Sequence, residues 1–344
     1  MCSRLRIWTT CGNMKTRIIY ILFLIIITPL CFEGAIRVMG YKAFQNTDYT
    51  ITSDPNNCIA SSENLGFALA TGKFKVTIND GHTYTATHEN GERITTDEIL
   101  SDSLPLLFMM GCSYTYGMGV NDDQNFVYLI QKELSNFKVR NFGVPGFGTV
   151  QSYLQLSKEI ANGRIPEVVA VNYCDFHADR NTLAPLYRKN LSIGFQNSSK
   201  AAKASMQSAK IPYFQDGSVV YEKWTDLYHN WSGRSTFASI NYLQSNADKS
   251  ARAKLDPEAT TLEIFVKIKK LCQKHGIRLI VTNLIKSSAS EKSMKSLKEN
   301  KIDCFDISLN LSGEKYTNLP FDSHPNAKAH KHYSQEILTR ILHP

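Results

Sequence analysis

Short apolar runs alternate with segments of helical periodicity from about residue 104 to the end of the chain. The apolar runs predict strands over residues 104–110, 139–142, 168–173, 277–282 and 302–305. The periodic segments predict helices over residues 126–134, 151–160, 261–275, 291–300 and 327–342. Strands and helices that alternate at these lengths favour a parallel sheet with helices on both faces, which is a three-layer α/β/α sandwich.

Residues 42–100 follow a different pattern. Alternating β-forming residues predict strands over 73–78 and 83–87, and Asn79-Asp80-Gly81 and Glu89-Asn90-Gly91 supply the turns after them. We therefore expect a small β-rich extension in front of the α/β domain, which covers residues 101–344.

Residues 184–255 interrupt the α/β alternation as a long insert. Aromatic residues stand here among Ser, Asn and Lys: Tyr213, Phe214, Tyr221, Trp224, Tyr228 and Trp231. An insert between a strand and the next helix lies near the carboxyl edge of a parallel sheet, where ligands bind. The insert is therefore either a lid or acceptor-binding surface, or a small subdomain that buries its own aromatic side chains.

The strongest apolar run covers residues 18–32, directly after Lys15 and Arg17. Its length of about 15 residues is close to that of a signal-peptide core and of a membrane span. Because no good cleavage site follows, we interpret residues 14–41 as an uncleaved membrane anchor, with a cleaved signal segment as the alternative. The basic residues place the N-terminus in the cytoplasm and predict an extracytoplasmic domain, periplasmic or at the cell surface. Residues 1–13 form an N-terminal tail.

The charge and cysteine pattern excludes some partners. The chain of 344 residues has 39 Lys and Arg against 31 Asp and Glu, a net charge of +8, and the basic residues are spread out. We expect no nucleic-acid partner, whereas an anionic membrane surface or an acidic glycan fits. The eight cysteines show no metal-ligand spacing, and no metal or cofactor is expected. Cys58, Cys272 and Cys304 are available to pair in an oxidising compartment. The oligomeric state is left open.

The first candidate for chemistry is Ser113, which follows an apolar strand and is flanked by Gly111 and Gly117. A serine hydroxyl is a poor nucleophile at neutral pH until a positioned base takes its proton. A sharp turn from strand to helix exposes such a hydroxyl. Without a base, the ordinary interpretation of this serine is a helix cap.

The candidate base is His324, in Asp322-Ser323-His324-Pro325-Asn326. His324 is expected to take the proton from Ser113, and Asp322 to orient the imidazole and stabilise the imidazolium. Together the three residues point to acyl-ester chemistry.

Two further polar loops follow predicted strands. Gly143 lies in a Gly-rich loop whose backbone N–H groups are candidates for stabilising an oxyanion, although a tight connection between strand and helix has the same pattern. Asn172 ends the next strand, and Asp175, His177 and Arg180 follow it as candidates to line the site. The alternative for this second loop is a salt-bridged, hydrogen-bonded connection.

These four elements, in this order, resemble the SGNH hydrolase superfamily, also called GDSL-like esterases. Gly111-Cys112-Ser113-Tyr114-Thr115 is similar to its first block, Gly143 to the glycine of its second, Asn172-Tyr173-Cys174-Asp175 to its third and Asp322-Ser323-His324 to its fifth. The resemblance covers about residues 104–183 and 256–342. It implies Ser113 as nucleophile, His324 as base, and the backbone N–H groups of Ser113 and Gly143 as oxyanion donors. Asn172 or His177 is a candidate for the further donor, because Cys174 takes the place of the family's asparagine. The apolar N-terminus and Asn90-Gly91-Glu92-Arg93 resemble a membrane-anchored bacterial envelope branch.

Two positions depart from the family pattern. Cys174 stands where the family has the asparagine that donates to the oxyanion, and a thiol is a weak donor. The last block is Asp-x-His instead of Asp-x-x-His. We expect a serine-dependent esterase or O-acyltransferase that forms an acyl-enzyme from an ester of an envelope glycan, cell-wall component or lipid. The alternative is a catalytically silent domain that binds a glycan or partner protein in envelope assembly.

Overall fold

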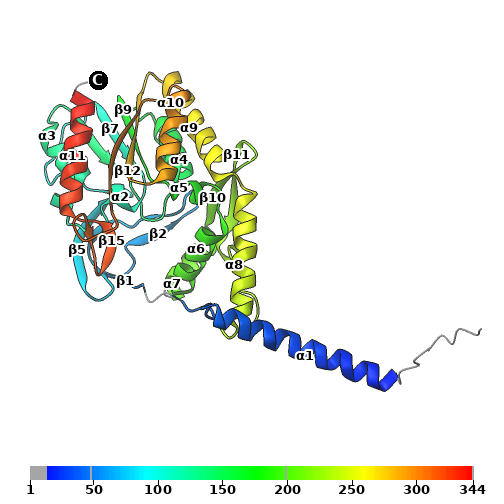
Figure 1. Cartoon of the computed structure of the whole chain (residues 1–344). Coiled ribbons are helices and arrows are strands. Elements are labelled where there is room, and N and C mark those ends of the chain that lie inside the picture. The colour runs from blue at the N-terminus through cyan, green and yellow to red at the C-terminus, as the bar shows by residue number, and fades with distance from the viewer. Residues whose placement is uncertain (1–13, 47–48, 198–199, 343–344) are drawn as a thin grey trace, which may run out of the picture. The chain divides into compact units, whose positions relative to one another are not determined.

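The computed structural model describes residues 14–46, 49–197 and 200–342 (Figure 1). The chain forms two compact units. One combines Met1–Asn46 with Asn230–Lys249, and the other combines Thr47–His229 with Ser250–Pro344. The tail expected over residues 1–13 lies outside the described residues.

The first unit contains α1 (Met14–Val38) and the start of α8 (Ala238–Ala253). An 18-residue window within Thr16–Val38 has a mean hydropathy of 2.3 and contains no buried residue, so the helix is long and apolar enough to cross a membrane. Ile36, near the end of the helix, is buried. Near its end, the carboxylate of Glu33 accepts the backbone N–H groups of Ala238 and Ser239 at 2.9 and 2.8 Å. This carboxylate satisfies donors that the first turn of α8 leaves without helical partners. The segment expected over residues 14–41 thus contains one apolar helix, which ends at Val38, and its role as an anchor or signal segment stays a prediction.

The second unit is built on a nine-stranded sheet with strand order β1-β4-β5-β6-β8-β7-β9-β12-β13. Strands β8, β7, β9, β12 and β13 are parallel, and the others pair antiparallel. The bounds, in chain order, are β1 Ile51–Asp54, β4 Gly72–Ile78, β5 His82–Glu89, β6 Glu92–Arg93, β7 Leu106–Met110, β8 Lys138–Asn141, β9 Val168–Tyr173, β12 Arg278–Ile285 and β13 Cys304–Leu309. The β-rich extension therefore continues the main sheet, joined to it where Arg93 pairs with Asn141.

Helices connect the strands and cover the sheet. They are α2 Ser113–Tyr116, α3 Phe126–Glu133, α4 Thr149–Ala161, α5 His177–Asn181, α6 Pro185–Asn197, α7 Lys200–Met206, α9 Pro257–Lys274, α10 Ser288–Glu299 and α11 Ala327–Leu342, with 3-10 turns η1 Asp122–Gln124 and η2 Trp224–Asp226. Three hairpins complete the unit: β2 Ile59–Ser62 with β3 Gly66–Leu69, β10 Lys210–Gln215 with β11 Ser218–Lys223, and β14 Thr317–Asn318 with β15 Asp322–Pro325. The α/β fold class predicted from the sequence is confirmed.

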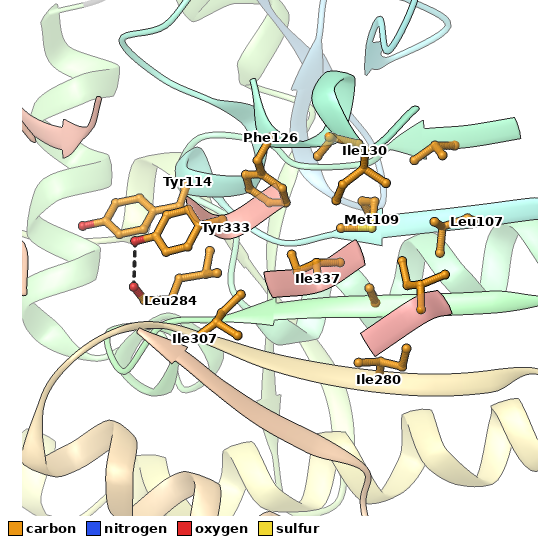
Figure 2. Close-up of a cluster of buried hydrophobic side chains, with 14 of the residues drawn as sticks. Leu107, Met109, Tyr114, Phe126, Ile130, Ile280, Leu284, Ile307, Tyr333 and Ile337 are labelled. Atoms are coloured by element: carbon orange, nitrogen blue, oxygen red, sulfur yellow. Dashed lines mark hydrogen bonds between the residues drawn. The ribbon is translucent and has the colours of Figure 1, made fainter. Parts of the chain in front are cut away.

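Alternation along β7 divides the core into two layers because successive strand side chains point to opposite faces. Leu107 and Met109 pack with α3 and α11, the layer that Figure 2 shows. Phe108 and Met110 pack with α4, α9 and α10 on the other face. All four side chains are fully buried, and each contributes roughly 1.5–3 kcal/mol by leaving water. The two layers fix β7, which leads directly into Ser113.

The aromatic insert packs in part into this core. Phe214 on β10 joins the layer of α4 and α9, and Trp224 stacks on Phe195 with 5.7 Å between ring centroids. Both side chains are buried. For these two residues the structure agrees with a packing subdomain and not with an exposed lid.

Candidate active site

The turn between β7 and α2 presents Ser113 as the first residue of a helix. Gly111 has φ +158°, and a Cβ there would lie 2.3 Å from Oγ1 of Thr115 and 2.9 Å from the carbonyl oxygen of Asn172. Gly143, on the neighbouring loop, is packed so that a Cβ would lie 2.3 Å from the backbone nitrogen of Tyr116. Only glycine allows these close approaches, which hold α2 against the loops after β8 and β9.

Ser113, His324 and Asp322 form one hydrogen-bonded chain. Nδ1 of His324 lies 2.8 and 3.0 Å from the two carboxylate oxygens of Asp322, and Nε2 lies 2.9 Å from Oγ of Ser113. A carboxylate only accepts, so the proton of neutral His324 sits on Nδ1 and Nε2 accepts the Ser113 hydroxyl. The Oγ is engaged in this contact, and no side-chain cap bond is made at the start of α2. The Asp-x-His spacing thus permits the contact expected between the two side chains.

The carboxylate of Asp322 has a further partner in Tyr49, whose hydroxyl donates to Oδ1 at 3.0 Å. The side chain of Asp322 is only 1% exposed. Burial by itself would raise the pKa of Asp322, but the hydrogen bonds from His324 and Tyr49 outweigh it, and the pKa lies below its usual value. Burial, followed by the charge of Asp322, raises the pKa of Tyr49. Asp322 is therefore held as a carboxylate that faces a neutral phenol.

The groups predicted to stabilise an oxyanion have different surroundings. The N–H of Ser113 is one of the donors that a helix start leaves without an intrahelical partner. The N–H of Gly143 instead donates to Oδ1 of Asn141 at 3.0 Å. Asn172 is fully buried; its amide donates to the carbonyl of Met110 and its oxygen accepts from Thr282. Asn172 therefore ties β9 to its neighbouring strands, and the oxyanion roles of Gly143 and Asn172 stay predictions.

The three residues expected to line the site have separate contacts. Asp175 accepts the hydroxyl of Ser287 at 2.6 Å. Arg180 donates to the carbonyl of Phe147 and lies over the ring of Phe176, 4.3 Å from its centroid. His177 is fully buried. The salt bridge expected within this loop is formed elsewhere, since Asp179 pairs with Arg252 at 2.6 Å.

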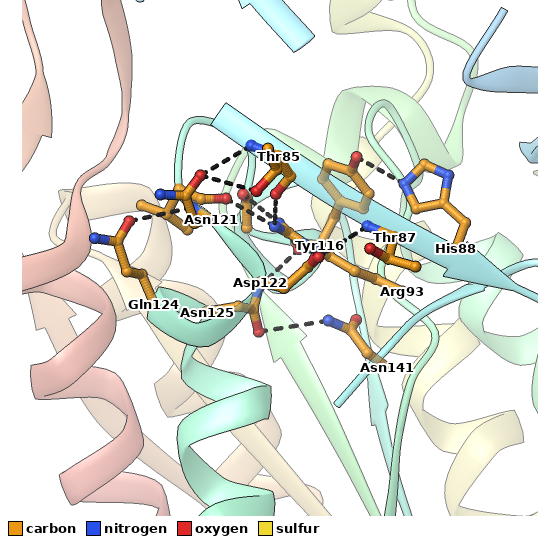
Figure 3. A network of polar contacts seen from close by, with 12 residues as sticks. Thr85, Thr87, His88, Arg93, Tyr116, Asn121, Asp122, Gln124, Asn125 and Asn141 are labelled. Atoms are coloured by element: carbon orange, nitrogen blue, oxygen red, sulfur yellow. Dashed lines mark hydrogen bonds and ion pairs between the residues drawn. The ribbon is translucent and has the colours of Figure 1, made fainter. Parts of the chain in front are cut away.

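A buried guanidinium fixes the loop that follows α2. The side chain of Arg93 is 0% exposed and pairs with Asp122 at 2.7 Å. Figure 3 shows this arrangement, which we call the Arg93 network. Its other acceptors are the backbone carbonyls of Thr85, Tyr116, Gly117 and Val120, at 3.0, 2.9, 2.7 and 2.7 Å. A single side chain thus holds the chain from the end of α2 to η1.

Sequence reasoning missed Tyr49 as a partner of the site. It lies 273 residues from Asp322 in the sequence, in the short stretch before β1, where no motif marks it. Asn90-Gly91-Glu92-Arg93 resembles a segment of the envelope branch, but the sequence does not show what the Arg93 side chain contacts. Arg93 lies in a two-residue strand beside Glu92, so no apolar pattern around it indicates a buried ion pair.

A scan against models of protein families gives no match, and neither does a search of curated proteins. Among solved structures, the chain is similar to a member of the lipolytic protein G-D-S-L family from Veillonella parvula DSM 2008, with 11% identity, a TM-score of 0.39, and coverage of 70% of this chain and 100% of that one. It is also similar to a catalytic mutant of Axe2, an acetylxylan esterase from Geobacillus stearothermophilus, with 11% identity, a TM-score of 0.36, and coverage of 71% and 95%. A third similar structure is a carbohydrate esterase, with 13% identity, a TM-score of 0.35, and coverage of 76% and 70%. At these TM-scores we base the function on the chain's own residues.

Proposed function

We propose that this chain is a serine-dependent esterase or O-acyltransferase of the SGNH type that works through an acyl-enzyme. The observation that carries the proposal is the Ser113–His324–Asp322 chain, with 2.9 Å between nucleophile and base and 2.8 Å between base and carboxylate. Both distances lie within the range that proton transfer and orientation require.

In the first half-reaction, Oγ of Ser113 attacks the acyl carbonyl while Nε2 of His324 takes its proton. The imidazolium that forms is stabilised by the carboxylate of Asp322, which stays ionised because of its lowered pKa. His324 then returns the proton to the leaving alcohol oxygen, and the ester bond breaks to leave an acyl-Ser113. The N–H of Ser113 is the oxyanion donor that the geometry supports best, and one such donor is worth roughly 2.7–4 kcal/mol.

In the second half-reaction, His324 removes a proton from the acceptor, which attacks the acyl carbonyl. His324 then gives that proton to Oγ of Ser113 as the acyl–oxygen bond breaks, which regenerates the free serine. Water as acceptor gives hydrolysis, and a sugar hydroxyl gives transfer. The proposed substrate is an ester of an envelope glycan, cell-wall component or lipid. The apolar helix α1 supports a substrate near a membrane, with the catalytic unit on the extracytoplasmic side.

The test is labelling of the full chain in detergent with a fluorophosphonate probe, which reacts with activated serines. We compare the wild type with Ser113→Ala and His324→Ala, and with Ser101→Ala and His332→Ala as matched controls outside the site. Labelling that is lost in the first pair and kept in the control pair supports the proposal. Absence of labelling in the folded wild type would favour the glycan- or partner-binding alternative, and labelling of Ser113→Ala would assign the nucleophile to another residue.

A further inference from the structure

Three side chains with metal-binding atoms meet behind the nucleophile turn. Cys112 precedes Ser113, and Cys174 and His177 follow β9, the strand next to β7 in the sheet. One ligand atom from each residue lies within 4.8 Å of the other two. All three side chains are completely buried. We call this group the Cys112 cluster.

The imidazole of His177 provides an independent indication of a ligand. Both of its ring nitrogens are buried and have no hydrogen-bond partner among the residues that the structure describes. The ring is held by Tyr173 and Phe176, at centroid distances of 5.6 and 5.4 Å, which offer it no polar group. A buried imidazole normally satisfies both nitrogens, because an unpaired polar group in the core costs free energy. A cation held between the ring and the two nearby thiols would give one of these nitrogens a partner.

Cysteine binds metal as the thiolate, so both thiols of the Cys112 cluster would lose their protons when a cation arrives.

We propose that Cys112, Cys174 and His177 bind one thiophilic d10 cation of the Zn²⁺ class. Two thiols and a neutral imidazole are a ligand set that Zn²⁺ uses, with Zn–S near 2.3 Å and Zn–N near 2.0–2.1 Å. Two sulfur ligands of one tetrahedral ion lie about 3.8 Å apart, so ligand atoms within 4.8 Å of one another would approach by up to about 1 Å when the ion binds. Binding releases the two thiol protons and forms two metal–sulfur bonds and one metal–nitrogen bond. No oxidant is needed.

Such a cation would join the nucleophile turn to the loop after β9. Cys112 is covalently next to Ser113, so metal binding would restrain the backbone that positions the hydroxyl. The site does not depend on the proposed esterase activity, because none of its three side chains takes part in the Ser113–His324–Asp322 chain. Binding and activity can therefore fail or succeed separately.

The experiment titrates Co²⁺, and then Zn²⁺, into the full chain in detergent after reduction and removal of metal with a chelator. One Co²⁺ per chain, with a thiolate-to-cobalt charge-transfer absorption that Zn²⁺ abolishes, is the expected result. Metal binding should weaken by at least about tenfold in each of three variants, Cys112→Ser, Cys174→Ser and His177→Gln. Loss of a residue that only hydrogen-bonds to a metal ligand already weakens binding by this amount. Cys272→Ser is the matched control, because Cys272 is also a buried free thiol but lies outside the cluster.

If a variant fails to fold, the Co²⁺ titration of the wild type still tests the proposal. A folded, reduced wild-type chain that shows no charge-transfer absorption overturns the proposal, and so does an absorption that survives in both cysteine variants. A Cys112–Cys174 disulfide in the native chain, detected by mass spectrometry as a loss of two hydrogens, together with no Co²⁺ binding after reduction, overturns it as well. Zn²⁺ should raise the melting temperature of the wild type and of Cys272→Ser, but not that of Cys174→Ser.

Discussion

Replacement of Arg93 by methionine tests whether the Arg93 network holds the loop behind the nucleophile. Methionine has a similar length and no charge, so the substitution removes the donors with little change in volume. Five hydrogen bonds end on this fully buried side chain. The four backbone carbonyls would lose a charged donor, whereas Asp122 would keep the N–H of Thr87 at 3.0 Å.

The expected cost follows from these contacts. A hydrogen bond to a charged group contributes about 1.5–3 kcal/mol net, but bonds that share one donor group are not additive. Removal of one partner of a buried ion pair costs roughly 3–5 kcal/mol, against about 5–15 kcal/mol for the stability of a typical domain. For a unit of this size, a loss near 4 kcal/mol lowers the melting temperature by roughly 8–16 °C.

The assay is thermal unfolding of the full chain in detergent, followed by tryptophan fluorescence, with probe labelling of Ser113 measured below the transition. Lys138→Met is the matched control, because Lys138 pairs with an Asp102 side chain that is 96% exposed, and it should shift the transition little. We expect Arg93→Met to label more slowly than the control even while it is folded, since the network ends on α2. A shift as small as that of Lys138→Met would refute the role given to the buried guanidinium.

Three other substitutions probe the surroundings of the site. Tyr49→Phe removes a hydrogen bond that lowers the pKa of Asp322. The stability from this carboxylate is present above its ordinary pKa of about 3.9 and is lost below it, so acid unfolding should begin at a higher pH in the variant. An unchanged midpoint of acid unfolding would contradict the contact. Burial lowers the pKa of His88 to about 4, so the wild type should lose stability as pH falls from about 6.5 toward 4. His88→Gln should lack that part of the dependence when melting temperatures are compared at both ends of the window. Gly143→Ala places a Cβ 2.3 Å from a backbone nitrogen of α2, so it should lower the free energy of unfolding by about 1–3 kcal/mol through overpacking and slow the labelling of Ser113. Gly313→Ala is the control, because a Cβ there meets nothing within 4 Å, and it should change neither stability nor labelling.

The regular core was predictable from the sequence because burial imposes a period on it. Val168–Tyr173 and Ala327–Leu342 have the bounds that the apolar pattern predicted. Elements of only four residues escaped, among them α2 (Ser113–Tyr116) and β15 (Asp322–Pro325), although they carry Ser113 and His324. Four residues cannot show a helical repeat, and the conformation of such segments is set by the contacts they make.

The sequence indicated which side chains would meet where they are close in sequence or follow a strand end, and their roles stay predictions. Asp322 and His324 are two residues apart, and Ser113 follows β7, so local spacing with one assumption about the sheet was enough. It could not show where Gly143 and Asn172 direct their hydrogen bonds, because both contacts depend on side chains whose positions arise from packing. A motif specifies which groups are available, and the surrounding core decides which of them face a substrate.

The two halves of the site are supported by different parts of the chain, which bears on how the Ser113–His324 distance is maintained. Ser113 is positioned by strand β7 and by glycines that allow α2 to touch its neighbours. His324 lies on a hairpin whose Asn318 amide donates to the carbonyl oxygen of His324 at 3.3 Å, and its orientation depends on Asp322 and Tyr49. Neither support includes the other catalytic side chain, so the 2.9 Å contact is made between two pre-positioned groups and loses little conformational entropy when it forms. This arrangement supports the proposed catalytic role over a merely structural hydrogen bond. A structural contact would not require that Asp322 orient His324, or that Tyr49 in turn hold Asp322.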